Sequence, residues 1–327
     1  MLIQSEYDIQ FYLPAPTAMV ALLHLHPTLD SFLRGTDDLH VESHPTHGFG
    51  PNPGQNNGAV TVPTTEYIDS FGNRCSRFVA PAGHLRLSGV NVLNADPNPD
   101  QIHHHARQHP IEELPSDVLQ FLLPSRYCQV DQFGGIAQDL FANTVSGWDR
   151  ATAIRDWVHD HVTFNYNAAR PTKTSMDVFT ERIGVCRDFQ HLAITLSRCM
   201  NIPARYVTGY IGDIRRPYSG AGDFSAWYQV YLNGQWINLD ARHNYPRQGR
   251  LLMAVGRDAA DVAITTSFGT ANLTRFYVES NEIDAAGNRV PLPVAGQPLD
   301  YPPIERNTPT QSNYRGASPT QTQSAVS

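Results

Sequence analysis

Residues 184–201 read Gly-Val-Cys-Arg-Asp-Phe-Gln-His-Leu-Ala-Ile-Thr-Leu-Ser-Arg-Cys-Met-Asn, and this stretch decides the fold of the second half of the chain. Its apolar residues recur at helical spacing and define one buried stripe. Asn201 and Pro203 supply a stop. The stripe consists of Val185, Phe189, Leu192, Ala193, Leu196, Cys199 and Met200. The pattern therefore predicts a helix whose first turn contains Cys186.

The position of Cys186 suggests a chemical role for its sulfur. In the first turn of a helix, unpaired backbone N–H groups and the helix dipole favour an anion. A cysteine placed there is biased toward the thiolate, which is the nucleophilic form, and the same N–H groups can line an oxyanion hole. The alternative is a structural cysteine that merely opens a helix, since unpaired cysteines are among the most buried residues. We interpret Asp188, in the same turn, as complementing the helix dipole.

A hairpin follows this helix. Asn233-Gly234 separates two apolar-rich runs, at 223–232 and 235–242, and this dipeptide is the strongest short-range hairpin signal. A two-residue loop pairs Leu232 with Gln235. Counting outward pairs Val230 with Ile237, Tyr228 with Leu239, Trp227 with Asp240, and Ser225 with Arg242. Because side chains alternate between faces, one face is expected to carry Ser225, Trp227, Asn238, Asp240 and Arg242.

The shared face is where the base and the orienting carboxylate of a Cys-His-Asp triad would stand. Asp240 supplies the carboxylate, and Ser225 is its expected diagonal neighbour. A serine hydroxyl, however, cannot accept a thiol proton near neutral pH as a histidine can. The sequence therefore predicts a nucleophile and a carboxylate, with Ser225 in the position of the base.

Two histidines are alternatives for the base. His191 follows Cys186 by five residues, about 140° around the helix axis, so it is expected to point away. His243 follows Asp240 by three residues, and a bend after Arg242 would bring it to the site. We predict His243 as the best candidate base, the alternative being a loop histidine that is hydrogen-bonded locally.

Two further residues are candidates for contact with a substrate. Trp227 is expected to pack beside the site and to form a wall of an acyl pocket. Arg242 is expected to lie at the same place, where its guanidinium would also stabilise a thiolate. Both expectations depend on the face assigned by the hairpin register.

The first third of the chain has a different pattern. Residues 1–115 contain short apolar runs separated by turn residues, which predicts an antiparallel β-sandwich-like domain. After a polar stretch the pattern becomes helical, as in 149–162. We predict a β-rich domain at 1–115, an α+β core at 116–305 and a disordered tail at 306–327, where large apolar side chains are almost absent.

Composition excludes several function classes. The net charge is −7 and no basic stripe is present, which argues against a nucleic-acid partner. No apolar run approaches the roughly 18 residues of a membrane span, and the start lacks a signal-peptide pattern. We therefore expect a cytoplasmic protein without a membrane partner. The four cysteines lack metal-ligand spacing, and we interpret His103-His-His105 as a solvated linker, so no metal or cofactor is predicted.

Four segments in this order resemble the bacterial transglutaminase-like superfamily of the cysteine protease type. They are Gly184-Val-Cys-Arg-Asp-Phe-Gln-His-Leu-Ala, Ile202-Pro-Ala-Arg-Tyr-Val-Thr-Gly-Tyr, Ser225-Ala-Trp-Tyr-Gln-Val-Tyr and Gln235-Trp-Ile-Asn-Leu-Asp. The resemblance covers about residues 1–280, including the β-rich domain that often precedes this core.

The resemblance implies a papain-like α+β fold and acyl transfer on peptide or amide bonds, with a peptide or protein as the substrate. Cys186 matches the nucleophile of the family, Asp240 matches the third member of its triad, and Ser225 matches its histidine. The departure at Ser225 leaves two hypotheses, an active cysteine peptidase or amidase and an inactive member that binds peptides.

Overall fold

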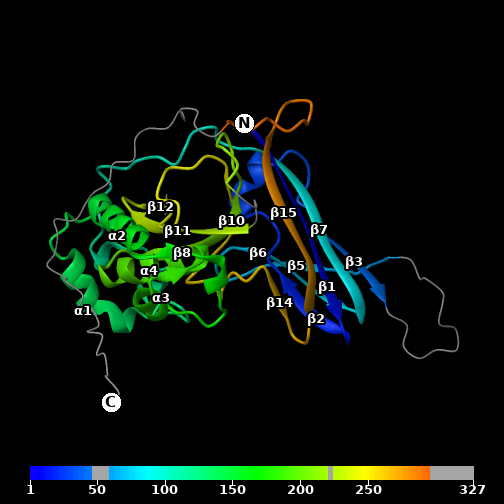
Figure 1. Ribbon diagram of the computed structural model, residues 1–327, viewed down its shortest axis with the longest axis horizontal. Helices are drawn as coiled ribbons and strands as arrows, with labels where there is room; N and C mark the ends of the chain where they lie inside the picture. Colours follow the sequence, from blue (N-terminus) through cyan, green and yellow to red (C-terminus); the bar gives the residue numbers. More distant parts are fainter. Residues whose placement is uncertain (46–58, 220–223, 295–327) are drawn as a thin grey trace, which may run out of the picture.

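The computed structural model describes residues 1–45, 59–219 and 224–294 (Figure 1). The predicted tail at 306–327 lies outside these ranges. Two sheets form a β-sandwich on one side of the molecule, and helices α1 to α4 gather around a third sheet on the other side. This arrangement confirms the predicted α+β class, with antiparallel sheets in both halves of the chain.

Several long strands of the sandwich bury every second residue. β1 (Leu2–Leu13) follows this alternation over nearly its whole length, with Ile3, Tyr7 and Ile9 in the core. One sheet has the order β15-β1-β7-β3-β4 and the other the order β14-β2-β6-β5. The remaining sandwich strands of the first third are β2 (Thr17–Ala21), β3 (His40–Pro45), β4 (Val60–Thr61), β5 (Thr65–Ile68), β6 (Arg74–Ala80) and β7 (Gly83–Asn94).

The sandwich does not end at residue 115. β14 (Thr265–Ser267) pairs with β2, and β15 (Asn272–Ile283) pairs with β1 along its full length. Both strands lie within the range 116–305 that the sequence assigned to the core. Periodicity detects a strand but not its partner, so the return of the chain to the first sheet could not be seen. The sandwich therefore contains strands from both sides of residue 115.

The second half of the chain contains a four-stranded antiparallel sheet of order β12-β11-β10-β13. Its strands are β10 (Ala204–Ile211), β11 (Phe224–Leu232), β12 (Gln235–Leu239) and β13 (Arg250–Gly256). The helices are α1 (Val130–Phe141), α2 (Trp148–His161), α3 (Ser175–Glu181) and α4 (Cys186–Cys199). Shorter elements are the 3-10 turns η1 (Pro27–Phe32), η2 (Ile111–Glu113), η3 (Leu119–Leu122) and η4 (Tyr166–Ala168), and the paired strands β8 (Thr163–Phe164) and β9 (Ile183–Gly184).

Helix α4 is buried on all sides, not along one stripe. It contacts β10 and β11 on one side and α1, α2 and α3 on the others, so every residue from Asp188 to Arg198 is buried. The polar residues of α4 obtain partners inside the protein. Arg198, for example, donates to the backbone carbonyls of Ala204, Leu123 and Arg257. The apolar pattern predicted the helix, but not the second layer of helices that covers its polar face.

The start of α4 is fixed by a cap. The Asp188 carboxylate accepts from the backbone N–H of Val185 at 2.9 Å and so caps the first turn of the helix, whereas its effect on the helix dipole stays a prediction. Gly184 makes this cap possible, since a Cβ there would lie 2.7 Å from the Cβ of Asp188. Cys186 thus begins the helix at a rigid position. Across the described ranges, every helix is too short or too polar to cross a membrane.

Candidate active site

The hairpin has the predicted register up to Leu239. Leu232 pairs with Gln235, Val230 with Ile237 and Tyr228 with Leu239. β12 then ends, and residues 241–243 form a turn. The predicted pairs of Trp227 with Asp240 and Ser225 with Arg242 therefore do not form. Of the five side chains expected on one face, Trp227 and Asn238 do meet, with the indole Nε1 donating to Asn238 Oδ1 at 3.0 Å.

Asp240 causes the chain to turn at this point. Its Oδ1 accepts from the backbone N–H groups of Arg242 at 3.0 Å and His243 at 3.1 Å. A carboxylate that bonds to the backbone two and three residues ahead stabilises a turn in place of a strand. The turn brings His243 back to Asp240, and the imidazole Nδ1 lies 2.9 Å from Asp240 Oδ2. The bend thus occurs before Arg242, one step earlier than expected.

The pair formed by Asp240 and His243 is largely shielded from water. The Asp240 side chain is 1% exposed and that of His243 is 16% exposed. Burial alone would raise the pKa of the Asp240 carboxyl, but His243 and Arg250 outweigh it and hold this pKa far below its usual range. Asp240 is therefore a carboxylate, and His243 donates to it through Nδ1–H. This leaves the lone pair of the neutral imidazole on Nε2.

The protonation of His243 follows from its surroundings. Burial lowers the pKa of His243, Asp240 raises it, and the cations Arg247 and Arg242 lower it again. The net pKa lies below the ordinary histidine value. His243 is therefore mainly neutral at neutral pH, which is the form that a general base needs.

Two helices hold the turn at 241–243 in place. From α4, Gln190 donates to Asp240 Oδ1 at 3.1 Å and accepts from the backbone N–H of Ala241 at 3.2 Å. From α2, Nδ1 of His159 donates to the backbone carbonyl of Ala241 at 3.1 Å and to that of Arg242 at 3.0 Å. Gln190 is one helical turn after Cys186, so both side chains lie on one face of α4. The face of α4 that carries Cys186 is therefore the face that contacts Asp240.

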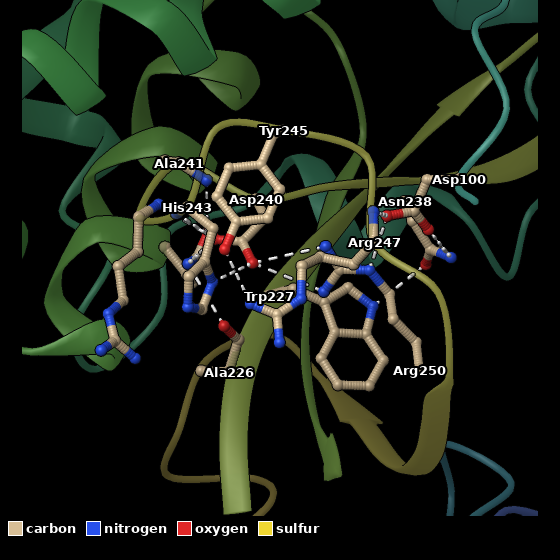
Figure 2. A network of polar contacts seen from close by, with 12 residues as sticks. Asp100, Ala226, Trp227, Asn238, Asp240, Ala241, His243, Tyr245, Arg247 and Arg250 are labelled. Carbon is tan, nitrogen blue, oxygen red and sulfur yellow. Dashed lines mark hydrogen bonds and ion pairs between the residues drawn. The ribbon is translucent and has the colours of Figure 1, made fainter. Parts of the chain in front are cut away.

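Arg250 completes the network around the carboxylate. Both of its terminal nitrogens lie 3.4 Å from Asp240 Oδ2, and its Nε donates to Asp100 at 2.8 Å. Figure 2 shows His243 and Arg250 on opposite sides of Asp240. Gln190, Arg250 and Asp100 were not predicted from the sequence to belong to this site. The i,i+4 spacing from Cys186 was a signal that Gln190 lies on the same face of the helix. Arg250 and Asp100 had no such local signal, because they bind each other across 150 residues.

The other predicted residues occupy different environments. Ser225 is 7% exposed in β11, and its hydroxyl has no hydrogen-bond partner among residues 1–45, 59–219 and 224–294. Trp227 is 1% exposed in a core with Val207 and Val255, which leaves almost none of its ring to contact a substrate. This burial fits a packing role. Arg242 is half-buried, with its guanidinium 3.8 Å from the ring centre of Phe164.

His191 points away from Cys186, as its spacing predicts. It is fully buried, its Nε2 accepts from the backbone N–H of Ala259 at 3.1 Å, and its ring stacks on Tyr127. Burial, with smaller effects of Arg187 and Arg198, holds the pKa of His191 well below its usual value. His191 is therefore a neutral structural residue. Among the described residues, no three His, Cys, Asp or Glu side chains cluster as metal ligands, and the absence of a metal stays a prediction.

Comparison with protein families identifies one segment of the chain. Residues 135–241 match the model of the transglutaminase-like superfamily. The chain carries a transglutaminase-like core. The match includes Cys186, Ser225 and Asp240, and it ends two residues before His243.

Similar proteins extend the likeness beyond this transglutaminase-like core. A solved structure from Cytophaga hutchinsonii, described as a putative cysteine protease, is 28% identical, covers 91% of this chain and 96% of its own, and superposes with a TM-score of 0.70. The uncharacterized protein ML0607 of Mycobacterium leprae is 27% identical over 63% of this chain and 77% of its own length. The uncharacterized protein Rv2569c of Mycobacterium tuberculosis is 32% identical over 30% of this chain and 35% of its own.

Proposed function

We propose that this protein is a cysteine acyl-transfer enzyme that acts on peptide or amide bonds, with Cys186 as the nucleophile and His243 as the general base. The observation that carries the proposal is the contact between His243 Nδ1 and Asp240 Oδ2 at 2.9 Å. This contact supports the proposal because it pairs the carboxylate with an imidazole, which Ser225 could not provide. The location of the protein in the cytoplasm, and a peptide or protein as its substrate, are part of this proposal.

The proposed reaction begins with proton transfer. His243 Nε2 takes the proton of the Cys186 thiol, and the thiolate attacks the carbonyl carbon of the substrate. Backbone N–H groups in the first turn of α4 stabilise the oxyanion. The C–N bond then breaks, and the imidazolium gives its proton to the leaving amine. A thioester remains on Cys186.

The second half of the reaction releases the acyl group. Water or an amine attacks the thioester carbonyl while His243 accepts its proton, and the Cys186 sulfur leaves and is protonated again. Water gives an acid and an amine gives a new amide. The similarity to a protein described as a putative cysteine protease favours water as the acceptor. A glutamine-containing peptide incubated with and without a primary amine distinguishes the two acceptors by product mass.

A labelling experiment tests the nucleophile. Iodoacetamide reacts with thiolates, and the burial-dominated environments of Cys75, Cys128 and Cys199 raise the pKa of each thiol to about 11. At pH 6 we expect peptide mapping to find the label on Cys186 alone, with no label on Cys186→Ala. His243→Gln should lose this reactivity, whereas His191→Gln should retain it. Equal, slow labelling of all four cysteines would instead favour a binding module without catalytic activity.

A further inference from the structure

Arg250 is a buried cation between two carboxylates from distant parts of the chain. Its side chain is 6% exposed, its Nε donates to Asp100 at 2.8 Å, and its Nη atoms lie 3.4 Å from Asp240 Oδ2. Asp100 precedes Arg250 by 150 residues and lies in the connection between the sandwich and the transglutaminase-like core. A segment outside the matched range is therefore linked through Arg250 to the carboxylate of Asp240 (Figure 2).

Asp100 is held firmly against the core. Its Oδ2 also accepts from the backbone N–H of Arg247 at 2.9 Å, its Oδ1 lies 3.4 Å from Nδ2 of Asn238, and its own N–H donates to the carbonyl of Arg247 at 3.0 Å. The side chain is 16% exposed. These contacts fix the direction from which Asp100 meets Arg250, so the charge pair has one geometry.

We propose that Asp100 is a positioning residue of this site, which acts through Arg250 to fix the orientation of Asp240 and the charge that Asp240 presents to His243. The inference rests on the proposed function. Negative and positive charges alternate from Asp100 through Arg250 to Asp240, and Asp240 in turn accepts from the neutral His243. Without Asp100, the guanidinium would be compensated by Asp240 alone, and Asp240 would stabilise an imidazolium less well.

Other charged groups also face His243. Arg242 and Arg247 lie in the same segment and oppose its protonation, and the Tyr245 ring centre is 5.7 Å from that of His243. α2 contributes His159, which donates to the carbonyls of Ala241 and Arg242, and Arg155, which is paired with Asp156 and lines the same pocket as Asp240 and Tyr245. The first turn of α4 carries Cys186 and the paired Arg187 and Asp188. Asp100 differs from these groups because it acts on the opposite side of Asp240. Asp100 should therefore affect His243 only by compensating the positive charge of Arg250.

The pH dependence of Cys186 alkylation in the full chain measures this coupling. A weaker negative charge beside His243 makes the pair of thiolate and imidazolium less stable, so the thiolate forms at higher pH. The midpoint is the pH at which Cys186 alkylation reaches half of its maximal rate. We expect Asp100→Asn to raise this midpoint by about half a pH unit, which slows alkylation at pH 6 about threefold. Asp100→Glu, which keeps the charge, should restore most of the reactivity.

Asp96→Asn is the matched control. Asp96 is an exposed residue of the same connection and accepts from Asn98, so this variant removes an equal charge at a site that makes a local contact. Its midpoint should stay at the wild-type value. If Asp100→Asn does not fold, Arg250→Gln tests the same coupling with the opposite sign, because an unscreened Asp240 should lower the midpoint.

The outcomes separate this inference from the proposed function. If wild-type Cys186 reacts at pH 6 and His243→Gln loses the reactivity, but Asp100→Asn has an unchanged midpoint, the role of Asp100 is overturned while the enzyme remains. Equal shifts in Asp100→Asn and Asp100→Glu would also overturn it, since a charge effect would then be absent. If wild-type Cys186 does not react at low pH, the proposed function fails first.

Discussion

His243 Nδ1 lies 2.9 Å from Asp240 Oδ2, and the two residues belong to one turn that Asp240 itself stabilises. A single carboxylate therefore both places the imidazole and fixes its tautomer. The resemblance aligns the family histidine with Ser225, which lies on β11, whereas His243 lies in the segment after β12. The imidazole and the carboxylate are thus three residues apart in the chain, and their relative position depends mainly on local geometry.

Asp240→Asn tests the control of the tautomer. An amide can donate to Nδ1 and so stabilise the tautomer with its proton on Nε2, which cannot act as a base toward the thiol. We expect acyl-transfer activity to fall roughly 100- to 10,000-fold. Asp8→Asn, which removes a carboxylate paired with Arg86 on the sandwich, is the control and should keep wild-type rates. Equal rates for wild type and Asp240→Asn would show that the pair has no catalytic role.

Ser225 provides a second test because its buried hydroxyl has no partner in the described part of the chain. Removing an unsatisfied buried polar group is expected to be neutral or stabilising. Ser225→Ala should therefore keep its activity within about twofold and its melting temperature at or above that of wild type. A tenfold loss of activity would instead give this serine a role in catalysis.

Ser225→His discriminates further between a displaced base and a lost base. A larger side chain at a 7% exposed position should destabilise the protein by about 1–3 kcal/mol through overpacking. Because His243 already serves Asp240, we expect no gain of activity in steady-state assays. A large gain would indicate that the natural protein had lost its base.

The sequence predicted the local parts of this site and missed the distant ones. Helical spacing placed Cys186 at the start of α4, and Asn233-Gly234 correctly predicted the pairing as far as Leu239. The predicted alternation of side chains between the two faces was wrong beyond Leu239. There the carboxylate of Asp240 accepts hydrogen bonds from backbone N–H groups, and the strand ends. An Asp at the end of an apolar run is a turn signal, and weighing it against alternation would have shortened the strand.

The parts that could not be predicted are contacts between distant segments. β15 joins the sheet of β1 after more than 250 residues, and Asp100 meets Arg250 across 150 residues. The local periodicity of the sequence could not predict either contact, because it shows which residues are buried but not which distant segment they contact. The burial of polar residues in α4 has the same origin, since it depends on helices packed from elsewhere in the chain.

Gln190 links α4 to the turn at 241–243, so its replacement is expected to lower both the stability of the protein and the reactivity of Cys186. Gln190→Leu removes the donor to Asp240 and leaves the N–H of Ala241 without its acceptor. We expect a loss of about 2–4 kcal/mol in unfolding free energy and slower alkylation of Cys186 at pH 6. Thr195→Val is the control, because this buried hydroxyl bonds within α4, to His191 O. It should lower stability without changing the alkylation profile.

His26 is expected to make the folding stability depend on pH, independently of the candidate active site. Burial is the main reason that the pKa of His26 falls from 6.5 to about 4. Between these values the unfolded chain binds the proton and the folded protein does not, so stability decreases as the pH falls from 6.5 toward 4. This histidine should contribute roughly 2–3 kcal/mol to the decrease, as measured by urea unfolding.

His26→Asn isolates this contribution. The His26 side chain accepts from the backbone N–H of Thr28 at 3.3 Å at the start of η1, and asparagine is a good acceptor at the same position. The variant should therefore lose less stability than wild type between pH 6.5 and 4, while the alkylation midpoint of Cys186 stays unchanged. Parallel stability curves for the two proteins would mean that His26 takes up its proton equally in the folded and unfolded states. The acid sensitivity would then have to come from other buried histidines, of which His191 is the first to replace, since its pKa is also held well below the ordinary value by burial.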